Sequence, residues 1–179
     1  NLCAVYNIGV TYEAAYLVME HLPAGSLYDR MGERISVEKC VAILIELTNG
    51  LYCMHESGIV HRDLKPANII FRDESTPVLV DFGISKTVGI ESDNVTGAGV
   101  ILGTPAYMAP EQINNVEIDN RADIYSLGAM AYEMLMGDAP FESDTPLATL
   151  MGQWTTPPAP LVGVDERLAA IIERMLAKE

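Results

Sequence analysis

Cysteine is scarce in this chain of 179 residues, and basic residues are far fewer than acidic ones. The three cysteines, Cys3, Cys40 and Cys53, are odd in number and lack metal-ligand or redox spacing, which argues against a disulfide framework. We therefore expect free thiols in a reducing compartment. Lysine and arginine total 11 against 25 acidic residues, so the net charge is −14. Because nucleic acid is bound by a basic face, no nucleic-acid partner is expected.

A long hydrophobic run is also lacking. The most apolar stretch, Ile124 to Met136, contains Glu133 and is well short of the roughly 20 residues that cross a bilayer, so no membrane segment is expected. No basic and apolar leader opens the chain, and we expect a cytoplasmic location without a signal peptide. The chain begins with Asn1 inside an apolar pattern, from which we expect the native N-terminus to lie upstream.

The composition supports one folded domain, since 49% of the residues are hydrophobic and 20% are charged. Hydrophobic periodicity and turn residues predict a mainly helical body with short hairpins. The predicted strands are Leu2–Val10, Ala15–Glu20, Gly58–Val60, Ile69–Phe71 and Val78–Val80. The predicted helices are Val37–His55, with Ser36 as its N-cap and Val41, Leu44, Ile45, Leu51 and Met54 as its apolar positions, then a fully buried Arg121–Met136 and an amphipathic Asp165–Ala177. A polar, glycine-rich loop is expected from Ser85 to Gly103.

Motifs with a chemical meaning stand in the middle of the chain. The segment His61-Arg62-Asp63-Leu64-Lys65-Pro66-Ala67-Asn68 is followed by Asp81-Phe82-Gly83 and then by Ala109-Pro110-Glu111. Each residue alone has an ordinary explanation, such as a capping aspartate or an asparagine in a turn. Together and in this order they resemble the signature set of protein kinases.

The resemblance is to eukaryotic-type serine/threonine protein kinases, and most of all to their bacterial members. It implies an α+β fold of two lobes, of which this chain is a partial catalytic domain. Residues 1–22 would form the end of the small lobe and the hinge, and residues 23–179 the truncated helical lobe. The implied reaction is transfer of the γ-phosphate of Mg·ATP to serine or threonine hydroxyls of proteins, including possible self-phosphorylation.

The resemblance also implies roles for individual residues. Asp63 would orient the attacking hydroxyl and accept its proton, and Lys65 would place a positive charge beside the γ-phosphate. Asn68 and Asp81 would supply oxygen ligands to Mg²⁺. Thr104 would hydrogen-bond toward Asp63 and Lys65, which favours serine/threonine specificity.

Further residues would bind the nucleotide or hold the site together. Met19 would stand beside the adenine, the backbone groups of Glu20 and Leu22 would bind its edge, and Ile70 would form the apolar floor of its pocket. The structural positions of the motifs are His61, which would pack on Phe82, together with Glu111 and Asp123, of which Asp123 would hold the backbone around the catalytic aspartate.

Regulation is expected through Arg62 and the loop that follows Asp81. Arg62 would bind a phosphorylated loop residue, and Thr96 stands where related bacterial kinases carry the activating threonine. A polar loop threonine without a role is the alternative. Ser26 and Ala67 stand where kinases that prefer basic substrates carry acids, so a strong preference for arginine near the target is not expected.

Some of the family pattern is missing from this chain. It has no glycine-rich phosphate loop and no lysine strand with its glutamate partner, and it stops before the arginine that pairs with Glu111 in the family. We therefore expect the chain by itself to bind ATP poorly and to turn over little. Two alternatives stay open: a catalytically inert pseudokinase or scaffold, and a small-molecule phosphotransferase. The first is opposed by the intact Asp63, Lys65, Asn68 and Asp81, and the second by the peptide-docking segment from Gly103 to Glu111.

Overall fold

The structure is a computed structural model that describes residues 1–12, 14–81, 105–113 and 118–178. The strands are β1 (Val5–Val10), β2 (Ala15–Met19), β3 (Ile69–Phe71) and β4 (Pro77–Leu79). The helices are α1 (Val37–Glu56), α3 (Pro110–Ile113), α4 (Arg121–Met136), α5 (Pro146–Thr155) and α6 (Glu166–Met175). The predicted loop from Ser85 to Gly103 lies outside the described residues.

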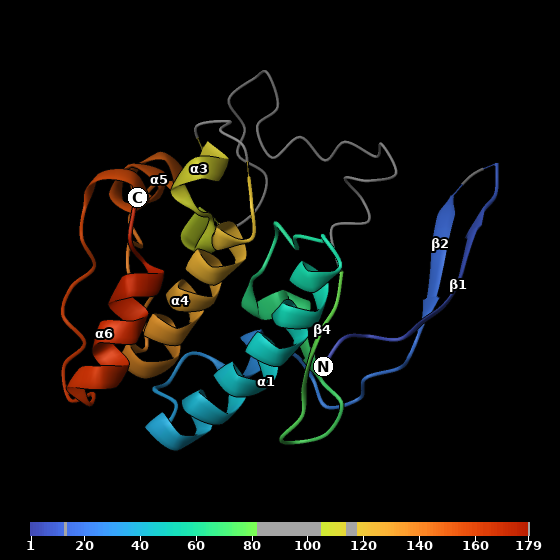
Figure 1. Ribbon diagram of the computed structural model, residues 1–179, viewed down its shortest axis with the longest axis horizontal. Coiled ribbons are helices and arrows are strands. Elements are labelled where there is room, and N and C mark those ends of the chain that lie inside the picture. The colour runs from blue at the N-terminus through green and yellow to red at the C-terminus, as the bar shows by residue number, and fades with distance from the viewer. Residues whose placement is uncertain (13, 82–104, 114–117, 179) are drawn as a thin grey trace.

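The body of the molecule is a group of helices around α4 (Figure 1). α4 contacts α1 on one side and α6 on the other, which explains why its residues are buried almost all round. Its predicted range is confirmed, although Ile124 is 39% exposed. Gly128 lets α6 approach closely, because a Cβ atom there would lie 2.8 Å from the Cβ of Met175. α6 is confirmed as well, with Asp165 as its N-cap.

α1 forms where the sequence predicts it, but its buried face is only partly the predicted one. The Ser36 side chain accepts a hydrogen bond from the Lys39 amide and begins the helix. Ile45, predicted as an apolar core position, is 55% exposed. Burial follows a neighbouring stripe at three- and four-residue spacing. The buried residues of that stripe are Cys40, Ile43, Leu47, Gly50, Leu51 and Met54.

The segment after α1 is a correction to the sequence prediction. Gly58–Val60 was expected to be a strand, whereas Gly58 takes a positive φ of 71° in a turn. The Ile59 amide donates to the Met54 carbonyl at 2.9 Å and closes the end of α1. A glycine in the left-handed region is a common helix terminator, and it prevails over the β-branched residues that suggested a strand.

The hairpin of β3 and β4 lies under the candidate site. Its register pairs Ile69 with Leu79, and single bridges widen it, from Leu2 to Leu79 and from Ser26 to Ile70. Residues 1–3 can lie against α1 because Gly50 has no side chain: a Cβ there would be 3.3 Å from the Asn1 carbonyl oxygen. The first strand was predicted to start at Leu2, but β1 starts at Val5, because Leu2 forms a β-bridge with Leu79 instead.

The β1–β2 hairpin projects away from the helical body (Figure 1). The strands pair antiparallel, with Val10 opposite Ala15, as the turn residues between them predict. Most of its side chains are exposed, including Tyr6 at 68% and Ile8 at 55%. Within the described residues, no helix is long and apolar enough to span a membrane.

Candidate active site

The loop between α1 and β3 is held by a buried carboxylate from α4. The Asp123 side chain is 1% exposed, and its oxygens accept the amide hydrogens of His61 at 2.8 Å and Arg62 at 2.9 Å. The His55 Nε2 atom lies 2.8 Å from the same carboxylate. A carboxylate is kept inside a protein only when such partners replace water. Asp123 therefore fixes the backbone immediately before Asp63.

His55 is a residue to which the sequence analysis gave no role. Its position in the last turn of α1 brings it to Asp123 on α4, a contact between segments far apart in the sequence. The sequence around His55 contains no pattern that predicts this contact. Only the packing of α1 against α4 creates it.

His61 is fully buried beneath the loop. Its Nε2 atom lies 3.0 Å from the Val80 carbonyl oxygen, and its Nδ1 atom accepts the Asp63 amide hydrogen at 3.4 Å. Because a carbonyl can only accept, these contacts assign the proton to Nε2. The imidazole thus joins the loop to the segment after β4. Phe82, its expected packing partner, lies outside the described residues.

The backbone of Arg62 is in a left-handed conformation, with φ of 65°. Its carbonyl oxygen accepts a hydrogen bond from Gln112 Nε2 at 2.8 Å, and Gln112 Oε1 accepts the Ala109 amide hydrogen at 3.0 Å. Gln112 therefore ties the backbone at Ala109 to the loop residue before Asp63. The sequence analysis gave Gln112 no role. The Arg62 side chain is exposed, and Thr96, its expected phosphorylated partner, lies outside the described residues.

Lys65 and Asn68 converge on the Asp63 carboxylate. The Lys65 ammonium lies 2.7 Å from Asp63 Oδ2, and Asn68 Nδ2 donates to the same oxygen at 3.2 Å and to the Asp63 carbonyl at 2.8 Å. The Asp63 side chain is still 43% exposed, so its carboxylate can reach a ligand. Thr104, expected to join this group, lies outside the described residues.

Asp81 stands next to Asn68 at the same end of the β3–β4 hairpin. The Val80 amide donates to the Asn68 carbonyl at 3.0 Å, which continues the ladder by one step beyond β4. Asp81 follows with φ of 62° and an exposed side chain. Asn68 uses its amide nitrogen toward Asp63, and no described residue donates to its amide oxygen, which can therefore bind a ligand. An amide oxygen and a carboxylate are the donors that Mg²⁺ prefers, so these residues fit that ion.

A pocket lies at the end of β2. It has a volume of about 470 Å³ and is lined by residues 17–22 together with Ile70 and Val80. All the residues expected to bind adenine, namely Met19, Glu20, Leu22 and Ile70, therefore lie around one pocket. The Glu20 amide is bonded to the Ala4 carbonyl at 2.9 Å. No described residue donates to the Glu20 carbonyl or accepts from the Leu22 amide, so both remain for the polar edge of a flat ring.

Another wall of the site comes from the segment Pro105–Gln112. A narrow hollow between it and the catalytic loop is lined by Asp63, Lys65 and Tyr107, among others. Ser126 Oγ donates to the Tyr107 carbonyl at 2.7 Å, and the Tyr107 hydroxyl donates to Glu133 Oε2 at 2.6 Å. Burial, together with this bond, raises the pKa of the Tyr107 hydroxyl.

Glu111 lies half-buried at the start of α3, and its charge affects the pKa values of Tyr125 and Arg121. Burial and, secondarily, the charge of Glu111 raise the pKa of the Tyr125 hydroxyl. Arg121, whose pKa is raised mainly by its hydrogen bond to Asp119, is also stabilised in its charged form by Glu111.

The full chain, residues 1–179, matches the family described as protein kinase domain. The chain belongs to the protein kinase family. Its helices and short antiparallel strands accordingly form a partial kinase fold of the α+β class, mainly the helical lobe, as the sequence predicted.

Named bacterial kinases are similar to this chain. PknL, a serine/threonine-protein kinase of Mycobacterium tuberculosis (strain ATCC 25618 / H37Rv), is 41% identical over 149 residues, 82% of this chain and 37% of PknL. Serine/threonine-protein kinase Pkn1 of Myxococcus xanthus is 36% identical over 182 residues, 99% of this chain and 26% of Pkn1. The probable kinase pknA2 of Bifidobacterium longum is 35% identical over 186 residues, 100% of this chain and 24% of pknA2. The kinase chain thus spans 24% to 37% of these relatives.

Proposed function

We propose that the protein containing this chain is a serine/threonine protein kinase that transfers the γ-phosphate of Mg·ATP to hydroxyl groups of proteins. The observation that carries the proposal is the convergence of Lys65 and Asn68 on the Asp63 carboxylate, with Asp81 beside Asn68. A scaffold that only binds partners needs none of these groups.

Asp63 is proposed to orient the attacking hydroxyl and to accept its proton as the new bond to phosphorus forms. Its exposed carboxylate can reach a substrate, and the bonds from Lys65 and Asn68 hold it in one orientation. Positioning of this kind is most of what phosphoryl transfer asks of a protein. The Asp123 carboxylate supports it by fixing the backbone of His61 and Arg62.

Lys65 is proposed to place its ammonium group beside the transferred phosphoryl group, where negative charge accumulates. The Asn68 amide oxygen and the Asp81 carboxylate would hold Mg²⁺. The bound Mg·ATP supplies the phosphoryl group and an ion that neutralises its charge. The pocket at residues 17–22 would bind adenine between apolar side chains, with the Glu20 carbonyl and the Leu22 amide at its polar edge.

The substrate is proposed to be a protein, because the segment from Pro105 to Gln112, which resembles the substrate-docking segment of the family, lies beside Asp63. The protein itself is one such substrate. We further propose that phosphorylated Thr96 pairs with the exposed Arg62 and promotes activity. The free thiols of Cys3, Cys40 and Cys53 and the need for ATP favour a cytoplasmic location for the kinase domain.

The test is a phosphate-transfer assay on the complete protein with labelled ATP and a generic protein substrate. We expect Asp63→Asn to lower the turnover rate by about 10²–10⁴-fold. Binding of ADP should be retained, since Asp63 is not in the adenine pocket. Asp138→Asn, the same chemical change at an exposed position after α4, is the matched control and should keep full activity.

Equal transfer by the wild type and Asp63→Asn would refute the assignment of Asp63. Transfer to aminoglycosides or small alcohols but not to protein would instead indicate a small-molecule phosphotransferase. In the same assay, full activity of Thr96→Ala would contradict the regulatory proposal and leave the catalytic one in place.

A further inference from the structure

The pocket at the end of β2 has walls that come from two parts of the chain. Residues 17–22 form one wall, and the floor is formed by Ile70 in β3 and Val80 directly after β4. The shape of the pocket therefore depends on how firmly the segment after β2 is held against β3. Any contact that joins these two parts is in a position to set the affinity of the pocket.

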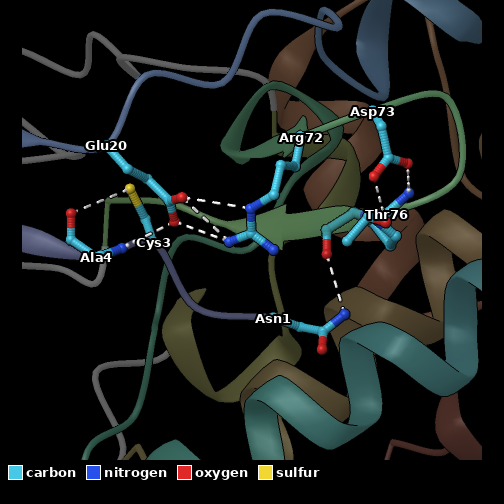
Figure 2. Close-up of polar contacts among 8 residues, drawn as sticks. Asn1, Cys3, Ala4, Glu20, Arg72, Asp73 and Thr76 are labelled. Carbon is cyan, nitrogen blue, oxygen red and sulfur yellow. Dashed lines mark hydrogen bonds and ion pairs between the residues drawn. The ribbon is translucent and has the colours of Figure 1, made fainter.

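The Glu20 carboxylate is such a contact (Figure 2). Arg72 Nη2 donates to both of its oxygens, at 2.9 and 3.1 Å, and Arg72 Nε lies 3.3 Å from Oε2. The Ala4 amide donates to Oε1 at 3.0 Å. One side chain thus ties together the residue before β1, the segment after β2 and the residue after β3. A two-pronged guanidinium–carboxylate contact fixes orientation as well as distance.

Arg72 is a firm anchor because the turn that follows it is closed by its own hydrogen bonds. The Arg72 amide donates to the Thr76 carbonyl at 3.0 Å. Asp73 accepts the amide hydrogens of Ser75 at 2.8 Å and Thr76 at 2.9 Å, as well as both of their hydroxyls. Hydrogen bonds, first of all from the Ser75 amide, lower the pKa of Asp73 to about 2. The Arg72 backbone is therefore fixed relative to Ile70, two residues before it.

The wall of the pocket formed by residues 17–22 has fewer contacts with the helical body than the β3–β4 hairpin has. The β1–β2 hairpin projects from the body with most of its side chains exposed (Figure 1). The chain enters it through the bond from the Cys3 amide to the Leu79 carbonyl, 2.9 Å, and leaves it at Glu20. Glu20 is only 16% exposed, whereas Arg72 is 44% exposed, so the carboxylate lies on the protein side of the pair. Loss of the guanidinium would remove the side-chain attachment of the segment after β2 at Glu20 and leave the bond from the Ala24 amide to the Phe71 carbonyl, 3.1 Å, as the next hydrogen bond to β3 along the chain.

We propose that Glu20 and Arg72 form a latch, a pair of positioning residues that holds the segment after β2 over Ile70 and thereby sets the affinity for adenine nucleotides. The inference rests on the proposed function, because it takes this pocket as the adenine site. The latch lies at the pocket rather than at Asp63, so it acts on nucleotide binding and not on the transfer step.

The experiment measures dissociation constants for adenosine and Mg·ATP and steady-state kinetics on the complete protein. Adenosine is the decisive probe because it is uncharged, so a lost positive charge cannot weaken it directly. Arg72→Gln should raise the adenosine dissociation constant and the KM for ATP by about fivefold, the effect expected of one partly exposed charge pair. The turnover rate at saturating ATP and the KM for the protein substrate should not change.

Matched variants separate the latch from general effects of charge. Arg72→Lys should recover part of the affinity, and exchange of the charges in Glu20→Arg/Arg72→Glu should recover part as well. Arg167→Gln is the control, because Arg167 pairs with Asp165 at the start of α6 on an exposed surface. It should leave all constants at wild-type values.

Salt provides a test that needs no substitution. Raising the ionic strength from 0.05 M to 0.5 M shortens the screening length to about 4 Å and weakens a partly exposed pair. The adenosine dissociation constant of the wild type should therefore rise with salt, whereas that of Arg72→Gln should stay constant. If Arg72→Gln does not fold, the wild-type salt series alone decides the question.

The outcomes distinguish the latch from the proposed function. Equal adenosine binding by the wild type and Arg72→Gln, or a wild-type constant that ignores salt, overturns the latch and leaves the kinase proposal intact. A fall in turnover rate with unchanged affinity also overturns it. Failure of the wild type to bind adenosine or Mg·ATP at all overturns both.

Discussion

Glu133 is an acid that α4 carries inside the helical body, where its carboxylate accepts the Tyr107 hydroxyl at 2.6 Å. Burial raises its pKa above the usual value of 4.5, and the hydrogen bond from Tyr107 only partly opposes this. Between the unfolded and folded pKa values, the folded protein keeps a proton that the unfolded chain has released. The contribution of Glu133 to stability is therefore largest below about pH 4.5 and is lost as the pH rises through the folded pKa.

We expect Glu133→Gln to remove this pH dependence and to raise the free energy of unfolding by about 1 kcal/mol at pH 8. The amide keeps an oxygen for the Tyr107 hydroxyl, so the bond survives while the buried charge is lost. Urea unfolding at pH 5, 6.5 and 8 measures the effect. Tyr107→Phe is the opposite control, because it removes the donor and should destabilise the protein most at pH 8. A Glu133→Gln protein that is less stable than the wild type at pH 8 would contradict this account.

Among the individual site residues, the sequence predicts those that belong to contiguous motifs. Asp63, Lys65 and Asn68 are close in the chain, and the structure brings them together around one carboxylate. His55 and Gln112 were missed, because each acts through a partner tens of residues away. A side chain that satisfies a distant backbone or carboxylate group leaves no local signal.

The close contact between α4 and α6 depends on Gly128, which has no side chain. A Cβ on Gly128 would lie 2.8 Å from the Met175 Cβ, closer than real carbon atoms approach. Gly128→Ala should therefore push α6 away from α4 and lower the free energy of unfolding by about 1–3 kcal/mol. Thermal or urea unfolding measures it.

Gly152 in α5 is the matched control for that substitution. A Cβ at Gly152 would meet the Phe141 Cβ at 3.5 Å, an ordinary contact. Since alanine is a better helix former than glycine, Gly152→Ala should stabilise the protein by about 0.5–1 kcal/mol. If both variants changed stability in the same direction, close packing of α4 on α6 would not be the cause.

Element positions were easier to predict than element faces. The range of α1 follows from its N-cap and periodicity, but its apolar residues cover more than one stripe, and the choice of stripe depends on where α4 lies. Ile45 was predicted on the apolar face but is exposed, whereas Cys40 and Ile43 are buried. Gly58–Val60 failed for another reason: one glycine at positive φ outweighs the strand propensity of two β-branched residues.

The reactivity of the three cysteine thiols reports on how far the molecule unfolds. Cys53 is exposed, whereas Cys3 and Cys40 are buried. Burial raises the pKa of the Cys40 thiol to about 12, and it also raises that of Cys3. Because the thiolate is the reactive form, we expect an alkylating reagent at pH 8 to modify Cys53 quickly and Cys40 only when the whole fold opens. Peptide mass spectrometry over time measures each site.

Cys3 adds information on partial opening. It lies in the segment that joins the β1–β2 hairpin to Leu79, so its modification reports on local detachment of that segment. Its rate should fall between those of Cys53 and Cys40, and denaturant should make all three rates alike. Modification of Cys40 at the rate of Cys53 in the native protein would show that the core around α1 is not closed.

The left-handed backbone at Arg62 and Asp81 has a consequence for how this protein can be engineered. Neither residue is glycine, and holding each one at a φ near 60° costs on the order of 1–3 kcal/mol. With the roles proposed above for Arg62 and Asp81, thermal stability and phosphoryl transfer therefore favour different residues at these two positions. A laboratory selection for thermal tolerance alone would enrich glycine at both, and the survivors would be sturdier proteins that no longer carry a carboxylate at position 81. Screens of this family for robust variants should score turnover in the same round.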